Sequence, residues 1–69
     1  MKMKTVLKNN IKDIRIEKNL TQQELAELIG TSRQSIIALE KGKYCPTAKL
    51  AWVICAVLEV KFEDLFWME

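Results

Sequence analysis

Residues 21–42 read TQQELAELIGTSRQSIIALEKG, a pattern that predicts two short helices joined by a tight turn. Thr21 can cap the first helix, because its hydroxyl accepts from backbone N–H groups that have no partner at a helix start, and Glu24 can reach back to the Thr21 N–H. Gly30 supplies the left-handed backbone conformation that ends a helix without a Cβ penalty. Ser32 is the predicted cap of the second helix. Because the connection is so short, the two helices must cross steeply.

The second helix opens with consecutive hydrogen-bonding side chains. Ser32, Arg33, Gln34 and Ser35 lie there in sequence, and each can pair with a base edge or a phosphate. In a DNA-binding helix-turn-helix, two helices cross at a tight turn and the second helix enters the major groove. Hydrogen-bonding side chains in the first turn of that second helix then reach the bases. The alternative is two ordinary helices of a small bundle, which would not require four such side chains. The pattern therefore predicts a DNA-binding helix-turn-helix.

Residues that match one known family are spread along most of the chain. They are Leu20-Thr21-Gln22-x-Glu24-Leu25-Ala26, Gly30-x-Ser32-Arg33-x-x-Ile36, Glu40-x-Gly42, Pro46-Thr47 and Leu58-x-Val60 leading into Leu65-Phe66. On these residues the chain resembles the Cro/C1-type (XRE-like) helix-turn-helix family over about residues 9–66, and most of all its short stand-alone regulators similar to the cytolysin repressor. The resemblance implies an all-α DNA-binding domain of five helices.

The candidate DNA-contacting residues lie on the two helices and directly after them. Gln22 is expected to bind a phosphate through its side chain and the N-terminus of the first helix. Arg33 suits guanine and Gln34 suits adenine. The other members of the predicted surface are Ser32, Ser35 and Ala38, the last touching a thymine methyl, with Lys43 and Tyr44 at phosphates. For Tyr44, packing of the ring on the edge of the core is an equally open alternative.

The family resemblance also implies an ion pair between Arg15 and Glu40. Arg15 lies in a helix expected from about Asn9 or Asn10 to Asn19, and Glu40 ends the predicted recognition helix. In the family, residues at these two places pair and join the two helices. The alternative is that Arg15 pairs locally or faces solvent.

Residues 50–58 are nine consecutive apolar residues, within a fourth helix that Thr47 is expected to cap. A helix that is apolar all round must be covered all round, and so small a domain can cover only one side. A short fifth helix is expected at about Phe62–Phe66, and the large apolar residues at the end of the chain would form an exposed patch in a monomer. A homodimer is therefore expected, with an interface made of Trp52, Val53, Ala56, Leu65, Phe66, Trp67 and Met68.

The 69 residues are expected to form one domain, with a helical core at 9–66 and terminal segments at 1–8 and 67–69. The first segment alternates in part as a strand does, which indicates a small two-stranded β-ribbon with the C-terminal tail. A disordered basic arm is the alternative. Lysines interrupt this segment too early for a signal peptide, and the apolar runs fall short of the ~20 residues of a membrane span. The expected location is the cytoplasm.

Charge and composition narrow the possible functions. Residues 1–43 carry nine basic and five acidic side chains, a net charge of +4, whereas residues 44–69 carry −2, so the basic half contains the predicted DNA-reading helix. The chain has no histidine, and Cys45 and Cys55 match no zinc-binding pattern. We therefore expect neither a metal nor a cofactor. Because the usual general base and a glycine-rich phosphate loop are also missing, catalysis is not expected.

These patterns together predict a sequence-specific transcriptional regulator, a repressor that binds an inverted-repeat operator in double-stranded DNA as a homodimer. Two alternatives stay open. One is the antitoxin of a toxin–antitoxin pair, in which the apolar C-terminal surface covers a toxin. The other is a protein-interaction module that does not bind DNA.

Overall fold

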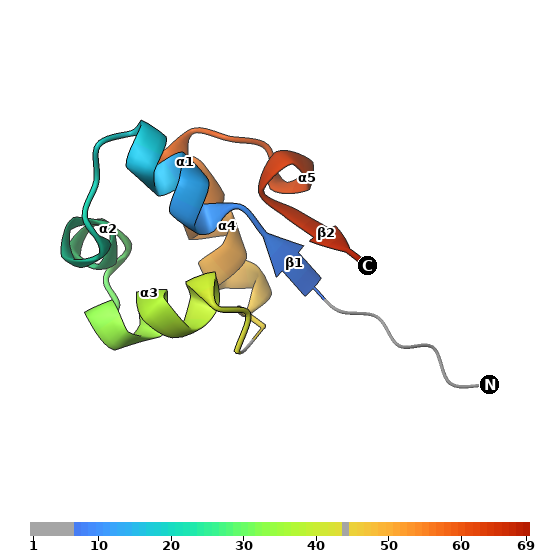
Figure 1. Ribbon diagram of the computed structural model, residues 1–69, viewed down its shortest axis with the longest axis horizontal. Coiled ribbons are helices and arrows are strands. Elements are labelled where there is room, and N and C mark those ends of the chain that lie inside the picture. Colours follow the sequence, from blue (N-terminus) through green and yellow to red (C-terminus); the bar gives the residue numbers. More distant parts are fainter. Residues whose placement is uncertain (1–6, 44) are drawn as a thin grey trace.

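The structure is a computed structural model that describes residues 7–43 and 45–69, and these residues form five helices and two short strands (Figure 1). The elements are β1 (Leu7–Asn9), α1 (Ile11–Glu17), α2 (Gln22–Ile29), α3 (Arg33–Glu40), α4 (Ala48–Leu58), α5 (Phe62–Leu65) and β2 (Phe66–Met68). The predicted five-helix domain with a small terminal ribbon is confirmed. No helix in the described part of the chain is long and apolar enough to cross a bilayer. Residues 1–6 of the expected strand and Tyr44 lie outside the described residues.

Side-chain caps fix where three of the helices begin. At α2, the Thr21 hydroxyl accepts from the Glu24 N–H at 3.0 Å and the Glu24 carboxylate accepts from the Thr21 N–H at 2.8 Å. The hydroxyls of Ser32 and Thr47 each accept from the N–H three residues ahead at 3.1 Å. Gly30 ends α2 with φ +88°. These contacts confirm the predicted caps on both sides of the helix-turn-helix.

Two helices are shorter than predicted. Helix α1 covers Ile11–Glu17, because Asn9 belongs to β1 and Asn19 has a left-handed backbone with φ +59°. Helix α5 ends at Leu65, since Phe66 adopts extended backbone angles of φ −125° and ψ 143° and begins β2. The chain therefore leaves α5 directly as a strand.

A single apolar core joins the helices, with α2 packed on α3 and on α4, and α5 on α4. Its buried members are Ile11, Leu25, Ala26, Ile36, Leu39, Ala51, Ile54, Leu58, Leu65 and Phe66. The expectation that Leu65 and Phe66 contribute an exposed interface is wrong, because they are 0% and 3% exposed. Helix α5 directs Leu65 into the core, and the alternation of β2 turns Phe66 inward while Trp67 is 38% exposed.

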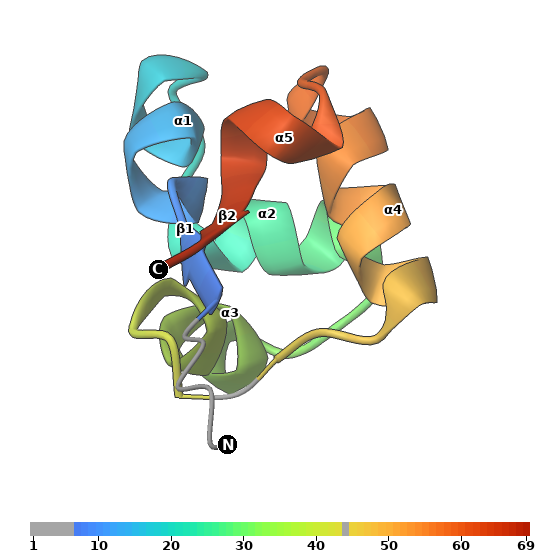
Figure 2. The same ribbon diagram turned by 90° about the vertical axis from the view of Figure 1, so that its right-hand side faces the viewer.

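The terminal ribbon connects the two ends of the described chain. Strands β1 and β2 are antiparallel, with Leu7 opposite Met68, Lys8 opposite Trp67 and Asn9 opposite Phe66. Figure 2 shows the ribbon running from the α1 and α5 end of the molecule toward α3. In both views α3 lies along the opposite edge of the molecule from α5.

Candidate nucleic-acid interface

Helix α3 presents one side to the core and the other to solvent. Ile36 and Leu39 are buried at 0% and 1% exposure, which fixes the inward side. At about 100° per residue, the residues that face away from this pair are Gln34, Ile37, Ala38 and Lys41, and Arg33 lies at the edge of that side. We call these five residues the outer α3 face. Its polar members are exposed, whereas Ile37 and Ala38 are half-buried. Of this set, Ile37 and Lys41 were not predicted from the sequence, although the same helical spacing indicates them once the buried pair is known.

The first turn of α3 is held by its two serines. The Ser32 and Ser35 hydroxyls lie 2.9 Å apart, and the Ser35 N–H donates to the Ser32 hydroxyl at 3.1 Å. Arg33 and Gln34, which lie between the serines, are both exposed. The cap therefore fixes the backbone from which these two longer side chains project.

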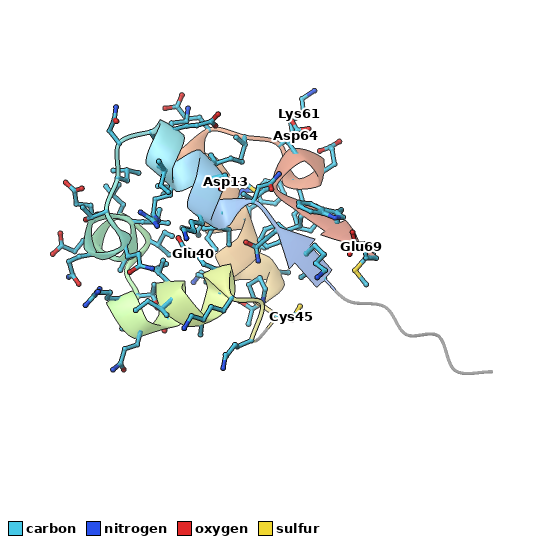
Figure 3. All side chains as sticks on the ribbon, viewed as in Figure 1. Asp13, Glu40, Cys45, Lys61, Asp64 and Glu69 are labelled. Carbon is cyan, nitrogen blue, oxygen red and sulfur yellow. The ribbon has the colours of Figure 1, made fainter. Side chains whose placement is uncertain are left out.

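The C-terminal end of α3 is held by a buried ion pair. Arg15 of α1 donates from Nε to Glu40 Oε2 at 2.6 Å and from Nη2 to Oε1 at 3.4 Å, and the two side chains are only 9% and 5% exposed. Figure 3 labels Glu40 between α1 and α3. Arg15 also donates from Nη1 to the Leu20 carbonyl at 2.8 Å. One guanidinium thus joins α1, the α1–α2 connection and the end of α3.

Gln22 takes part in the same network. Its Nε2 donates to Glu40 Oε1 at 3.1 Å, so the amide of the first α2 residue faces the end of α3. This contact was not predicted, because it joins residues 18 positions apart and leaves no local pattern in the sequence. The phosphate contact expected of Gln22 stays a prediction. A phosphate bound by Nε2 would have to share or replace the bond to Glu40.

Basic residues follow α3 directly. Lys41 and Lys43 are exposed, and Gly42 between them has φ +70°. The Gly42 N–H donates to the Leu39 carbonyl at 3.0 Å and the Lys43 N–H to the Ala38 carbonyl at 2.9 Å. This turn keeps both lysines next to the last turn of the helix, where they add positive charge to the outer α3 face.

A separate apolar surface lies over α4 and α5. Trp52 is 80% exposed and Phe62 is 53% exposed, and between them is a hollow of about 390 Å³. The residues that line it are Trp52, Cys55, Ala56, Glu59, Val60 and Phe62. Val53 is half-buried and Ala56 is exposed. Burial, and secondarily the nearby Glu63 carboxylate, raises the pKa of the Cys55 thiol above its usual value.

Comparison with known proteins agrees with this geometry. A family model described as helix-turn-helix matches residues 11–65. The chain belongs to the Cro/C1-type helix-turn-helix family. A relative within this helix-turn-helix group, from Methanocaldococcus jannaschii and named an uncharacterized HTH-type transcriptional regulator, is 53% identical over 60 residues, covering 87% of this chain and 91% of that protein.

Two more distant similarities are informative. The antitoxin PezA of Streptococcus pneumoniae is 36% identical over 56 residues, which are 81% of this chain and 35% of that protein. The solved structure of the clp gene regulator ClgR from C. glutamicum superimposes with a TM-score of 0.72 at 28% identity, covering 78% of this chain and 70% of that chain. The helix-turn-helix fold is therefore shared well beyond the nearer relatives.

Proposed function

We propose that this protein is a transcriptional repressor that binds an inverted-repeat DNA operator as a homodimer. The observation that supports this proposal most is that α3 is held at both ends while its polar residues face solvent. Its first turn exposes Arg33 and Gln34, and its last turn is held by the buried pair of Arg15 and Glu40. A helix fixed at both ends and polar on its outer face suits insertion into a major groove.

The outer α3 face supplies both kinds of contact that specific DNA binding requires. Arg33 pairs with guanine O6 and N7, and Gln34 pairs with adenine N6 and N7. Ala38, with Ile37 beside it, contacts thymine methyl groups. Ser32, Ser35, Gln22, Lys41 and Lys43 bind phosphates, which position the helix without reading sequence.

The homodimer uses the apolar surface over α4 and α5 together with the exposed residues at the end of β2. Its proposed members are Trp52, Val53, Ala56, Phe62, Trp67 and Met68. Exposed aromatic and methionine side chains are enriched at protein interfaces. A two-fold dimer that holds its α3 helices about 34 Å apart would enter successive major grooves on one face of DNA, which requires an inverted repeat. Repression follows most simply, because occupancy of the operator by itself blocks access to it.

Substitution of Arg33 tests base recognition. Arg33→Ala is expected to cost about 1–3 kcal/mol on the preferred site and to flatten selectivity at one position of each half-site. Lys43→Ala should weaken binding to all sequences alike and lower the salt slope by about one unit per subunit. Lys61→Ala is the control, because Lys61 lies at the α5 end of the molecule, away from α3 (Figure 3). Equal losses on preferred and random duplex for Arg33→Ala would make Arg33 a phosphate contact.

An antitoxin is the second candidate function. The similarity to the antitoxin PezA and the exposed Trp52 and Phe62 favour it, because such a surface also suits a toxin. A chain that is stable alone as a homodimer supports the repressor, whereas a chain that stays soluble only with a partner protein supports the antitoxin. Failure to bind any duplex at low salt would leave an interaction module without DNA binding.

A further inference from the structure

The side chain of Asn9 joins three elements of the fold. Its Nδ2 donates to the Leu39 carbonyl of α3 at 2.9 Å, and its Oδ1 accepts from the Ile11 N–H at the start of α1 at 3.1 Å. Its backbone belongs to β1, opposite Phe66 of β2. We propose that Asn9 is a positioning residue that links the terminal ribbon to the recognition helix and sets how the C-terminal end of α3 lies on DNA. The part of this proposal that concerns DNA rests on the function proposed above.

The carbonyl that Asn9 contacts lies in the last turn of α3. Leu39 is among the last four residues of α3, whose carbonyls have no partner within the helix. The same carbonyl accepts from the Gly42 N–H at 3.0 Å, in the turn between Lys41 and Lys43. Asn9 therefore holds the point from which the basic turn departs, and a small hollow of about 190 Å³ marks where ribbon and turn face each other.

The chemistry of the side chain distinguishes this role from simple capping. The start of α1 needs only an acceptor, which aspartate or serine would provide equally well. The contact with Leu39 needs a donor on the same side chain, and an amide supplies both. Aspartate lacks the donor, and serine is too short to reach across to α3 while accepting from Ile11. The two bonds together therefore need a donor and an acceptor on one side chain, which the Asn9 amide supplies.

The Asn9 link connects the proposed dimer interface with the proposed DNA-binding helix. Strand β2 carries Trp67 and Met68 of the proposed dimer interface, and β1 pairs with β2 along its length. A displacement of the ribbon in the dimer would reach α3 through Asn9. By linkage, DNA binding and dimerisation would then strengthen each other by the same factor.

Asn9→Ser is the test, with Asn10→Ser as its matched control. Asn10 is the adjacent asparagine, and within the described residues its side chain has one long hydrogen bond, of 3.5 Å to the Asp64 carbonyl, away from α3. The readout is amide hydrogen exchange of Gly42 and Lys43 in the DNA-free protein. A net hydrogen bond of about 1 kcal/mol corresponds to about fivefold faster exchange in Asn9→Ser. The Asn10→Ser variant should stay within about twofold of the wild type.

A second readout is the ratio of affinities for a selected operator and for random duplex. It should fall about fivefold in Asn9→Ser and hold in Asn10→Ser. Unchanged exchange at Gly42 and Lys43 would overturn the link, and faster exchange with an unchanged affinity ratio would overturn its role on DNA. If Asn9→Ser does not fold, Asn9→Thr gives the same test, because its hydroxyl retains an acceptor for the Ile11 N–H, is too short to reach the Leu39 carbonyl, and adds no charge. A wild type without any sequence preference would refute the proposed function, while the exchange measurement would still decide whether Asn9 holds α3.

Discussion

The buried ion pair of Arg15 and Glu40 allows a quantitative stability prediction. Arg15→Met keeps much of the aliphatic stem, so the loss is mainly electrostatic. It leaves the Glu40 carboxylate, whose side chain is 5% exposed, with the Gln22 amide as its remaining donor in the part of the chain that the structure describes. Removing one partner of a buried pair costs about 3–5 kcal/mol. The free energy of unfolding of a small domain is only about 5–15 kcal/mol. Each kcal/mol lost lowers the melting temperature by about 4–8 °C, so the melting temperature of Arg15→Met should fall by more than ten degrees.

The assay is a double-mutant cycle with Glu40→Gln. The double variant carries no charge at this site, so it should be more stable than the sum of the single losses predicts, by about 2 kcal/mol or more. Urea unfolding followed by helical circular dichroism measures each variant. All samples need one protein concentration, because dimerisation makes apparent stability depend on it.

The chain offers an exposed pair as the control. Lys8 and Glu69 lie 3.9 Å apart with side chains 48% and 65% exposed, and such pairs contribute only about 0–1 kcal/mol. The cycle Lys8→Met with Glu69→Gln should give coupling in that range. A coupling for Arg15 and Glu40 no larger than this control would refute the claim that the pair fixes α3.

Two further outcomes concern the surface over α4 and α5. Trp52→Glu places a charge where an 80% exposed tryptophan now lies, so this variant should sediment as a monomer and bind DNA at least about tenfold more weakly. The control Lys18→Glu, at an exposed position directly after α1, should stay dimeric. A dimeric Trp52→Glu would place the interface elsewhere. Cys45 should react with iodoacetamide faster than Cys55 at pH 8, because the raised pKa of Cys55 lowers the fraction of its thiol that is ionised. For the same reason the alkylation rate of Cys55 should rise at higher pH than that of Cys45. Equal rates and equal pH dependence would contradict the burial of Cys55.

Features that depend on neighbouring residues could be predicted from the sequence. The capping box of Thr21 and Glu24 and the turn at Gly30 involve residues close in the chain, and their chemistry leaves few alternatives. Pairing of Arg15 with Glu40 joins residues 25 positions apart, and it was expected only because the family resemblance supplied it. Alternation alone indicated the ribbon, whose paired strands the structure places at Leu7–Asn9 and Phe66–Met68.

Features that depend on the three-dimensional path could not be predicted. The sequence shows that Leu65 and Phe66 are apolar, but only the direct passage from α5 into β2 turns both inward. Gln22 and Asn9 have contacts 18 and 30 residues away, and an amide that reaches so far looks like any surface amide in the sequence. Which exposed side chains contact DNA or a second chain remains a prediction.

Selection of binding sites from random duplex DNA, followed by the mass of the complex with the selected site, tests the central claim most directly. Two copies of α3 on a two-fold dimer predict an inverted repeat with half-site centres about 10–10.5 base pairs apart. The complex should contain two chains per duplex and form at protein concentrations where the free chain is already dimeric. Enrichment of an asymmetric site bound by a single chain, or no enrichment at all, would contradict the account.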